Sequence, residues 1–454
     1  MKHKSQWITE KRFAIATLGC KVNQFDSEVM REKLGAIGFR EVPFNQKADI
    51  YIINTCTVTG RSDYQSRQLI RRAHRSNPKA VVIATGCYAE VFPHSVRVVE
   101  GVSVVLGNQA KREIASIASH LIADRKPFVR VPPGANGPLE HYHIEGFSRH
   151  CRAFLKIQDG CNAACSYCIV PRARGRSRSL PPEKVLDQLV RLKTQGYQEV
   201  VLVGIHLGSY GLDLSPPTSL AQFIELLESR PNLPPRIRLS SVEPIDFTGA
   251  LLSAIGSSLR ICPHLHIPLQ SGDNGILSRM NRGYTREVFG TLVREIGEKV
   301  PSVCIGLDVI GGFPGEEERH FQNTVDLIEE LSVAYLHVFP FSPRPGTRAF
   351  DFPQKIRGDE IRRRCMILRE LGQTKREAFY GRFLHQRVRV LEEKTTVDGE
   401  GRRKGVSRNY IPVWVEPGGV SPSGEIEVEI TDVTGQKVLG KRIKEQGERR
   451  KEIG

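Results

Sequence analysis

The sequence lacks any long apolar run. No stretch approaches the roughly 18 consecutive apolar residues that a membrane-spanning helix needs. The polar start, from Met1 to Trp7, also lacks the apolar core of a secretory signal. We therefore expect no membrane span and predict a cytoplasmic protein.

The sequence also lacks the cysteine pairs of a structural zinc site. It has ten cysteines, but no CxxC pair with a distant second pair. Disulfides are rare in a reducing compartment, and six of the ten stand in motif-like settings, which favours metal ligation of another kind. Cys151 would be the fourth ligand if zinc were bound after all. Otherwise the remaining cysteines are expected to be buried free thiols: Cys151, Cys262, Cys304 and Cys365.

Length and charge limit the possible organisation and partners. A chain of 454 residues is too long for one ordinary core, and roughly three domains are expected. Lys plus Arg outnumber Asp plus Glu by 66 to 50, a formal charge of +16, which favours a polyanion such as RNA or DNA. A solvated basic surface explains the charge equally well. Only the positions of the Lys and Arg residues in the fold can distinguish these two explanations of the charge.

The most informative stretch is Cys161-Asn-Ala-Ala-Cys165-Ser-Tyr-Cys168, which follows a strand-like run. Three thiolates at this spacing can hold three corners of a cubane iron–sulfur cluster and leave one iron without a protein ligand. An open iron can bind S-adenosylmethionine, and an electron from the cluster can then cleave the C–S bond to give a 5'-deoxyadenosyl radical. The spacing therefore predicts radical chemistry.

Three more cysteines follow strand-like runs near the N-terminus. The runs are 13–17, 50–54 and 81–85, and the cysteines are Cys20, Cys56 and Cys87. With helical patterns between them, the strands should run parallel, so that all three cysteines emerge at one edge of an open α/β sheet. We predict a second three-thiolate cluster there. Three small buried hydrophobes at strand ends are the alternative.

Strand and helix patterns alternate again after the central motif. Strands are expected near 153–158, 199–204, 236–242, 264–269, 303–310 and 335–341, and helices near 181–195, 218–229, 246–257, 285–299 and 316–331. Six strands predict a partial (β/α)6 barrel. A basic helix from Asp359 to Tyr380 is expected to close this domain.

In such barrels the reactive groups lie at the carboxyl ends of the strands. Glycine there lets the backbone approach a ligand, and a carboxylate or amide can hydrogen-bond a ribose or the methionine ammonium. The candidates for cofactor binding are Gly204, Glu243, Gln270 and Gly311. Each is weak alone, since Gly-Gly-Phe-Pro-Gly is more often only a turn and a lone His206 is more often a satisfied or surface histidine.

Alternate arginines follow the central motif: Arg172, Arg174, Arg176 and Arg178. They fit a solvated face and a site for substrate phosphates equally well.

The last part of the chain changes to short alternating strands. Five are expected, at 387–391, 405–407, 410–416, 425–430 and 438–442, and they predict a small barrel of the kind that binds RNA. Cations and aromatic rings mix there, which suits phosphate contact and base stacking. These residues are Arg402, Arg403, Lys404, Arg408, Asn409, Tyr410 and Trp414. Tyr and Trp that only fill the core are the alternative.

Together these segments resemble the methylthiotransferase family of radical S-adenosylmethionine enzymes. The resemblance rests on Thr17-Leu-Gly-Cys-Lys-Val-Asn-Gln24, Asn54-Thr-Cys-Thr-Val58, Thr85-Gly-Cys-Tyr88, the Cys161 to Cys168 motif and the terminal barrel. It covers nearly the whole chain and implies the family's domain order. The order is an N-terminal methylthiotransferase domain with an auxiliary cluster (10–123), a linker (124–146), a radical S-adenosylmethionine core (147–378) and a TRAM-like RNA-binding domain (380–445).

Within the family the chain most resembles the MtaB-like branch, which acts on N6-threonylcarbamoyladenosine in tRNA. The motifs concerned are Gly19-Cys-Lys-Val-Asn-Gln24, Ser240-Ser-Val-Glu-Pro244 and His266-Ile-Pro-Leu-Gln-Ser-Gly272. The branch that acts on isopentenyladenosine typically has Gln-Met-Asn after the first cysteine, where this chain has Lys21-Val22-Asn23. A third branch modifies an aspartate of a ribosomal protein.

The resemblance implies two [4Fe-4S] clusters and S-adenosylmethionine as cofactors, and the anticodon region of tRNA as partner. It implies that Cys161, Cys165 and Cys168 hold the cluster that cleaves S-adenosylmethionine, and that Cys20, Cys56 and Cys87 hold an auxiliary cluster. It also implies a backbone contact from Tyr167 to the cofactor's adenine. The electron donor and the sulfur donor stay open. A non-catalytic iron–sulfur RNA-binding protein is the alternative from another class.

Overall fold

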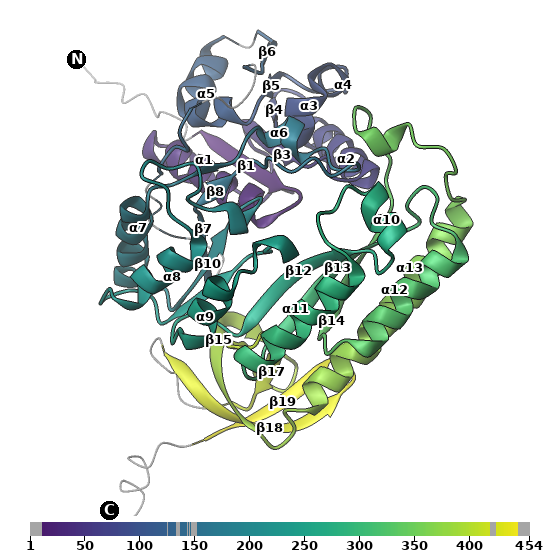
Figure 1. The fold of residues 1–454 in the computed structure, drawn as a ribbon. Helices are drawn as coiled ribbons and strands as arrows, with labels where there is room; N and C mark the ends of the chain where they lie inside the picture. Colours follow the sequence, from purple (N-terminus) through teal and green to yellow (C-terminus); the bar gives the residue numbers. More distant parts are fainter. Residues whose placement is uncertain are drawn as a thin grey trace, which may run out of the picture. The chain divides into compact units, whose positions relative to one another are not determined.

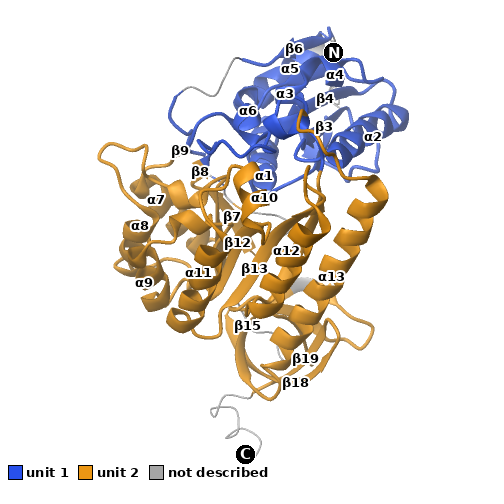
Figure 2. Ribbon diagram, turned by 45° about the vertical axis from the view of Figure 1, so that its right-hand side comes forward, with its two compact units in different colours: residues 1–144, 159–178, 342–350 blue, residues 145–158, 179–341, 351–454 orange. Residues whose placement is uncertain are grey.

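The computed structural model describes residues 11–124, 126–132, 137–142, 144, 146, 152–417 and 424–443. They form two compact units (Figure 2). Unit 1 comprises residues 1–144, 159–178 and 342–350, and unit 2 comprises 145–158, 179–341 and 351–454. Cys151 and parts of the predicted linker lie outside the described residues. No described helix is both long and apolar enough to cross a bilayer.

Unit 1 is built on a six-stranded sheet with the order β2-β1-β3-β4-β5-β6, in which all neighbours are parallel. The strands are β1 (Arg12–Thr17), β2 (Arg40–Glu41), β3 (Ile50–Thr55), β4 (Val81–Gly86), β5 (Val104–Leu106) and β6 (Phe128–Arg130). Every residue of β3 and β4 is buried, which explains their nearly continuous apolar sequence. The predicted open parallel sheet is confirmed.

Helices cover both faces of this sheet (Figure 1). They are α1 (Lys21–Ala36), α2 (Gly60–Ser76), α3 (Cys87–Val91), α4 (Pro93–Arg97), α5 (Ile114–Ala123) and α6 (Val170–Arg174), with 3-10 turns at η1 (Gln109–Glu113) and η4 (Arg348–Phe350). One core joins α1 and α5 to alternate strand residues such as Ile52, and the other joins α2 to the intervening ones, such as Ile53. This division follows from the two-residue period of a strand.

Unit 2 contains the six parallel strands that the sequence predicts for a partial barrel. They are β7 (Arg152–Lys156), β10 (Glu199–Val203), β11 (Arg236–Leu239), β12 (His264–Gln270), β13 (Cys304–Gly311) and β14 (Tyr335–Pro340). They pair in two groups of three, β7-β10-β11 and β12-β13-β14. The groups are linked where the Val242 N–H donates to the His266 carbonyl at 3.0 Å and where Ile237 bridges to Ile261.

Helices alternate with these strands. They are α7 (Pro182–Thr194), α8 (Leu220–Glu228), α9 (Gly249–Ser257), α10 (Asn274–Arg279), α11 (Arg286–Lys299), α12 (Glu318–Glu330) and α13 (Gly358–Gly381), with 3-10 turns at η2 (Leu207–Ser209) and η3 (Pro244–Asp246). A side-chain oxygen caps the first turn of several helices, which satisfies a backbone N–H that has no helical acceptor. The caps include Ser219 of α8, Thr248 of α9 and Thr285 of α11. A short pair, β8 (Gln158–Asp159) and β9 (Arg178–Ser179), completes the β structure of this part of the chain.

The chain ends in the predicted small barrel, which is closed in the order β15-β16-β17-β19-β18. Its strands are β15 (Arg387–Val397), β16 (Arg403–Ser407), β17 (Pro412–Val415), β18 (Glu425–Thr434) and β19 (Lys437–Arg442). Val413, Val428 and Ile430 are fully buried inside it. Closure leaves no strand edge exposed, as is usual for small barrels of this type.

Two buried arginines of β11 attach the terminal barrel to the parallel strands within unit 2. Arg236 donates to the carbonyls of Val406 and Ser407 at 3.0 Å each. Arg236 and Arg238 also both bind the buried carboxylate of Glu199, at 2.7 and 3.0 Å. Burial alone would raise the pKa of Glu199, but the two guanidinium groups outweigh it and lower that pKa to about 2. The sequence predicts the strand but not this ionic cluster.

Candidate functional site

The three N-terminal cysteines lie where three neighbouring strands end. Cys20 follows β1 and caps α1, Cys56 follows β3, and Cys87 follows β4 and begins α3. Gly19 has φ of +89°, and a Cβ there would lie only 2.8 Å from the Cys56 sulfur. Glycine thus allows the loop of Cys20 to approach Cys56. Burial, and then the charges of Cys87 and Cys20, raise the pKa of Cys56 to about 11.

Two asparagines of the quoted motifs fix these loops. Asn23 donates to the carbonyls of Leu18 and Thr55, at 2.8 and 3.0 Å. Asn54 donates to the carbonyl of Asn23 at 2.8 Å. The loops that carry Cys20 and Cys56 are therefore tied together by side-chain amides. The motifs in the sequence include both asparagines but assign them no role.

Arg344 fixes the segment just after Cys56 from a distant part of the chain. It donates to the Thr57 hydroxyl at 2.6 Å and pairs with the carboxylate of Asp63. The Thr57 hydroxyl in turn donates to Asp63 at 2.7 Å. All three side chains belong to unit 1.

Arg174 lies beside the same cysteines. Its side chain is 2% exposed, and its Nε donates to the Cys87 sulfur at 3.4 Å. Its Nη1 binds Asp26 at 3.0 Å and Asp159 at 3.2 Å, and its Nη2 binds the Asn23 side chain. The pattern of alternate arginines predicts either a solvated face or a site for substrate phosphates. For Arg174 the structure contradicts both predictions, because its guanidinium is buried among protein acceptors.

The second cysteine triplet occupies one loop of unit 1, with the three thiols partly buried. The Cys161 N–H donates to the Gly175 carbonyl at 3.0 Å, and the Ala163 N–H donates to the Cys161 sulfur at 3.3 Å. The Cys168 N–H donates to the Cys165 carbonyl at 3.1 Å, and α6 begins two residues later. The triplet therefore sits on a turn that its own backbone hydrogen bonds define.

Both triplets have the donor chemistry of a cubane cluster. Each offers three thiols, and each has an N–H donor directed at a ligand sulfur, from Arg174 to Cys87 and from Ala163 to Cys161. Such hydrogen bonds stabilise the negative charge of cluster thiolates and tune their potentials. Two [4Fe-4S] clusters therefore fit the residues present.

The strand-end candidates lie where the sequence places them within unit 2. Gly204 follows β10, Glu243 follows β11, Gln270 ends β12 and Gly311 ends β13. Gln270 has φ of +66° at an irregularity of the β12–β13 pairing. Glu243 forms an ion pair with Arg282. Tyr167, the remaining candidate, lies on the cysteine loop of unit 1.

Gly204 and Gly311 also lie where neighbouring side chains leave little room for a Cβ atom. A Cβ on Gly204 would lie 2.8 Å from the Gln158 side-chain oxygen, and one on Gly311 would lie 3.0 Å from the Cys365 sulfur. Neither position tolerates a larger residue without movement of its neighbours.

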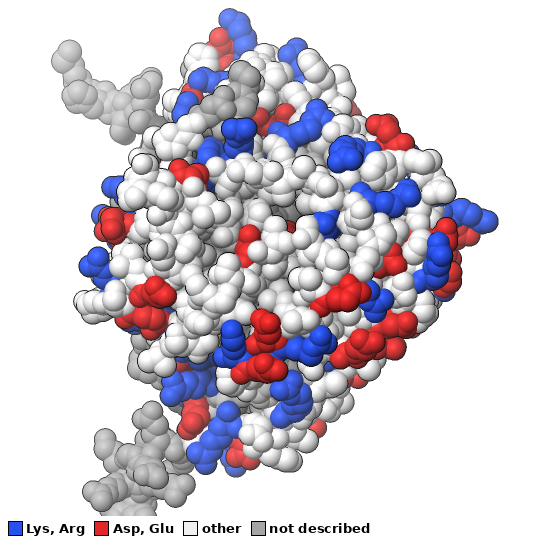
Figure 3. Space-filling view, viewed as in Figure 1, with Lys and Arg blue, Asp and Glu red and all other residues white. Residues whose placement is uncertain are grey.

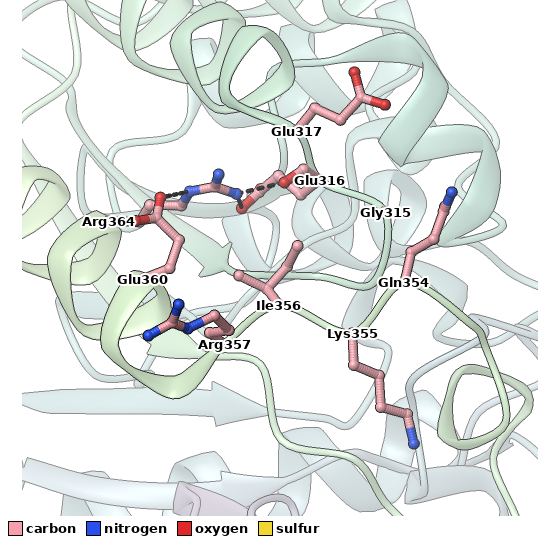
Figure 4. Close-up of a pocket in the computed structure, with 9 residues that line it drawn as sticks. All are labelled: Gly315, Glu316, Glu317, Gln354, Lys355, Ile356, Arg357, Glu360 and Arg364. Carbon is pink, nitrogen blue, oxygen red and sulfur yellow. Dashed lines mark hydrogen bonds and ion pairs between the residues drawn. The ribbon is translucent and has the colours of Figure 1, made fainter.

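A cavity of about 400 Å³ lies beside the Gly-Gly-Phe-Pro-Gly turn of unit 2. Arg364 occupies one wall, where its guanidinium binds Glu316 at 2.9 Å and Glu360 at 2.6 Å (Figure 4). Glu316 also accepts the Gly312 N–H at 2.7 Å. Glu316 at the end of this motif therefore connects the turn to α13 through its ion pair with Arg364.

One cluster of titratable groups was not predicted. His266, Asp308 and His337 lie on the neighbouring strands β12, β13 and β14, and their possible ligand atoms all lie within 4.8 Å of one another. Asp308 is 2.8 Å from His266 and 3.4 Å from His337. Burial would raise the pKa of Asp308, but the two imidazoles outweigh it and lower that pKa. Strand register, which the sequence leaves open, brings the three together.

Several of the barrel residues predicted to bind RNA also make contacts within unit 2. Arg408 donates to the Leu259 carbonyl at 2.6 Å, and the Tyr410 ring lies 4.1 Å from the His264 ring. Asn409 is buried and hydrogen-bonded to Ser407. Arg402 binds Asp398 at 2.9 Å.

Comparison with known proteins agrees with this architecture. Residues 12–107 match the family described as "Uncharacterized protein family UPF0004", and residues 155–328 match the radical SAM superfamily. The chain is 40% identical to the threonylcarbamoyladenosine tRNA methylthiotransferase MtaB of Aquifex aeolicus, over 84% of this chain and 92% of the relative. The chain belongs to the methylthiotransferase family. Its MtaB-like branch also includes a Bacillus subtilis protein, 36% identical over 88% of this chain and 89% of that relative.

Another branch of methylthiotransferases matches at lower identity. A tRNA-2-methylthio-N(6)-dimethylallyladenosine synthase of Pelotomaculum thermopropionicum is 33% identical, over 80% of this chain and 82% of the relative. Among solved structures, the radical S-adenosylmethionine methyltransferase TsrM of Kitasatospora setae, with cobalamin and a [4Fe-4S] cluster bound, has a TM-score of 0.56 at 17% identity. The match covers 75% of this chain and 77% of TsrM, and at this identity it shows a similar fold alone.

Proposed function

We propose that this methylthiotransferase inserts sulfur and a methyl group at C2 of N6-threonylcarbamoyladenosine next to the anticodon of tRNA. The observation that carries the proposal is the 40% identity to a threonylcarbamoyladenosine tRNA methylthiotransferase over nearly all of that relative. Lys21-Val22-Asn23 after the first cysteine supports the same branch. The enzyme would act on tRNA in the cytoplasm.

In this proposal the two cysteine triplets have different tasks. Cys161, Cys165 and Cys168 hold the [4Fe-4S] cluster that would supply the electron for reductive cleavage of S-adenosylmethionine. The triplet of Cys20, Cys56 and Cys87 holds the auxiliary cluster. Radical chemistry suits the reaction, because an adenine C2–H bond is too weakly acidic for an ordinary side-chain base.

The remaining candidates position the cofactor. Gln270 and Glu243 offer hydrogen bonds at the strand ends, Gly204 and Gly311 leave space for the backbone to approach, and Tyr167 offers its backbone. Asn23 and Asn54 hold the loops of Cys20 and Cys56 in place, and Arg174 donates to the sulfur of Cys87. The domain boundaries proposed for these tasks are 10–123, 124–146, 147–378 and 380–445.

The test is mass spectrometry of nucleosides from total tRNA of a strain that lacks this protein, compared with the same strain complemented by it. Methylthio-threonylcarbamoyladenosine should appear only on complementation. A response of methylthio-isopentenyladenosine instead would overturn the substrate but keep the chemistry. If neither nucleoside responds, the aspartate of a ribosomal protein becomes the substrate to examine.

A further inference from the structure

The solvent-facing side of α2 has an unusual composition. At 100° per residue, the positions 61, 64, 65, 68, 72 and 75 fall on one stripe of a helix. This α2 stripe consists of Arg61, Tyr64, Gln65, Gln68, Arg72 and Arg75. Its three arginines are exposed, and Tyr64 is 56% exposed. The opposite side packs on the sheet through Ile70 and Ala73.

The α2 helix itself is poor in acidic residues. The helix has five arginines and one acidic residue, Asp63, which is buried and pairs with Arg344. Within the described residues, Arg61, Arg72 and Arg75 take part in no ion pair. Figure 3 shows Lys and Arg side chains over the region where Figure 1 labels α2. The exposed Arg363 of α13, by contrast, binds Glu318 and Glu360. An ordinary solvated helix mixes both signs in this way.

The stripe also starts close to the N-terminal cysteines. Gly60, the first residue of α2, comes four residues after Cys56. Its N–H donates to the Ser342 hydroxyl at 2.9 Å, and the Thr59 side chain caps the first turn. A helix of this length extends for about 25 Å from that fixed end. If a nucleotide of an RNA lies at the edge of unit 1 that carries Cys20, Cys56 and Cys87, the adjacent nucleotides can therefore reach the α2 stripe.

We propose that the α2 stripe binds the tRNA backbone. The arginines neutralise phosphates, the exposed Tyr64 ring offers a stacking surface for an unpaired base, and Gln65 and Gln68 hydrogen-bond ribose or base edges. This inference rests on the proposed tRNA substrate. It also assigns RNA contact to unit 1, beyond the terminal barrel whose Arg408 and Asn409 pack internally.

The test measures fluorescence anisotropy of the cluster-loaded enzyme with a labelled tRNA that carries N6-threonylcarbamoyladenosine, over a series of salt concentrations. Loss of two phosphate contacts in the variant R72Q/R75Q should lower the slope of log affinity against log salt by about 1.4 to 1.8. Because this variant releases fewer counterions from the tRNA, its binding should be about 25-fold to 60-fold weaker than that of the parent at 0.1 M salt. Tyr64→Ala should weaken binding about 5-fold to 150-fold through lost stacking.

The matched control is R191Q/R294Q, which removes two exposed arginines from α7 and α11 with the same change of net charge. It should leave the slope nearly unchanged, and all variants should retain the thermal unfolding temperature of the parent. Equal effects of the two double variants, or no effect of R72Q/R75Q, overturn the α2 assignment while the proposed function stands. Failure of the unaltered enzyme to bind the tRNA overturns both.

Discussion

At the scale of single residues, Arg174 shows how the sites are held together. One guanidinium binds two carboxylates and a ligand sulfur, and it stands six residues after the last cysteine of the central motif. The segment that carries Cys161, Cys165 and Cys168 is thereby fixed beside Cys87, within the same unit. Buried charges of this kind depend strongly on their partners, because an uncompensated ion in the interior is costly.

Replacement of Arg174 by Gln should therefore destabilise the protein. Asp159 and Asp26 each lose an ion pair, although Lys111 still binds Asp26 at 2.9 Å. We expect the free energy of unfolding to fall by about 3 kcal/mol. Urea denaturation of the cluster-free protein measures this change. The exposed neighbour Arg176→Gln is the control and should change stability by less than about 0.5 kcal/mol; equal losses would contradict the buried role of Arg174.

The sequence predicts the six cysteines at this scale because their chemistry depends on local spacing and on strand ends. It does not predict which of four alternate arginines is buried. Arg174 meets Asp26 from 148 positions away, and only the tertiary fold brings the two together. The triad of His266, Asp308 and His337 was missed for the same reason.

At the scale of elements, β11 joins the terminal barrel to the parallel strands. Its two arginines share Glu199, and Arg236 also binds Glu425 of β18 at 2.9 Å. A strand with two arginines would ordinarily expose them, yet all four of its residues are buried. The hydrogen-bonded carbonyls and carboxylates compensate for the loss of water around these cations.

The depressed pKa of Glu199 makes this attachment sensitive to acid. Its folded pKa of about 2 lies below the ordinary 4.5, so its contribution is complete above about pH 5 and declines as pH falls towards 2. We expect about 2 kcal/mol of that contribution to be lost by pH 3. The difference in urea stability between parent and Glu199→Gln should shrink by this amount between pH 5 and pH 3. A difference independent of pH would contradict the ionic account.

Most elements themselves could be predicted. The helices expected at 285–299 and 316–331 are observed at Arg286–Lys299 and Glu318–Glu330, because strong apolar periodicity sets them. In the terminal barrel, β15 and β18 extend beyond the predicted ends, to Val397 and Thr434. Those extensions are polar, and cross-strand pairing rather than local sequence holds them in the strands.

At the scale of the whole molecule, unit 1 is discontinuous in sequence. It combines residues 1–144 with 159–178 and 342–350. The two later segments supply Arg174 and Arg344, the buried partners of Asp26 and Asp63. The sequence predicts an N-terminal domain that ends at 123, because its patterns are local. The contacts that complete the unit come from segments that follow much later in the chain.

This discontinuity predicts opposite effects of one substitution in two contexts. In the full chain, Asp63→Asn removes the ionic partner of Arg344 and leaves that guanidinium buried, so we expect a loss of about 3 kcal/mol. In a fragment of residues 1–144, Arg344 is absent and Asp63 lacks this cationic partner. Asp63→Asn should therefore stabilise the fragment, by about 1 kcal/mol or more. Urea denaturation followed by circular dichroism measures both, and destabilisation of the fragment as well would show that Asp63 does not depend on the distant segment.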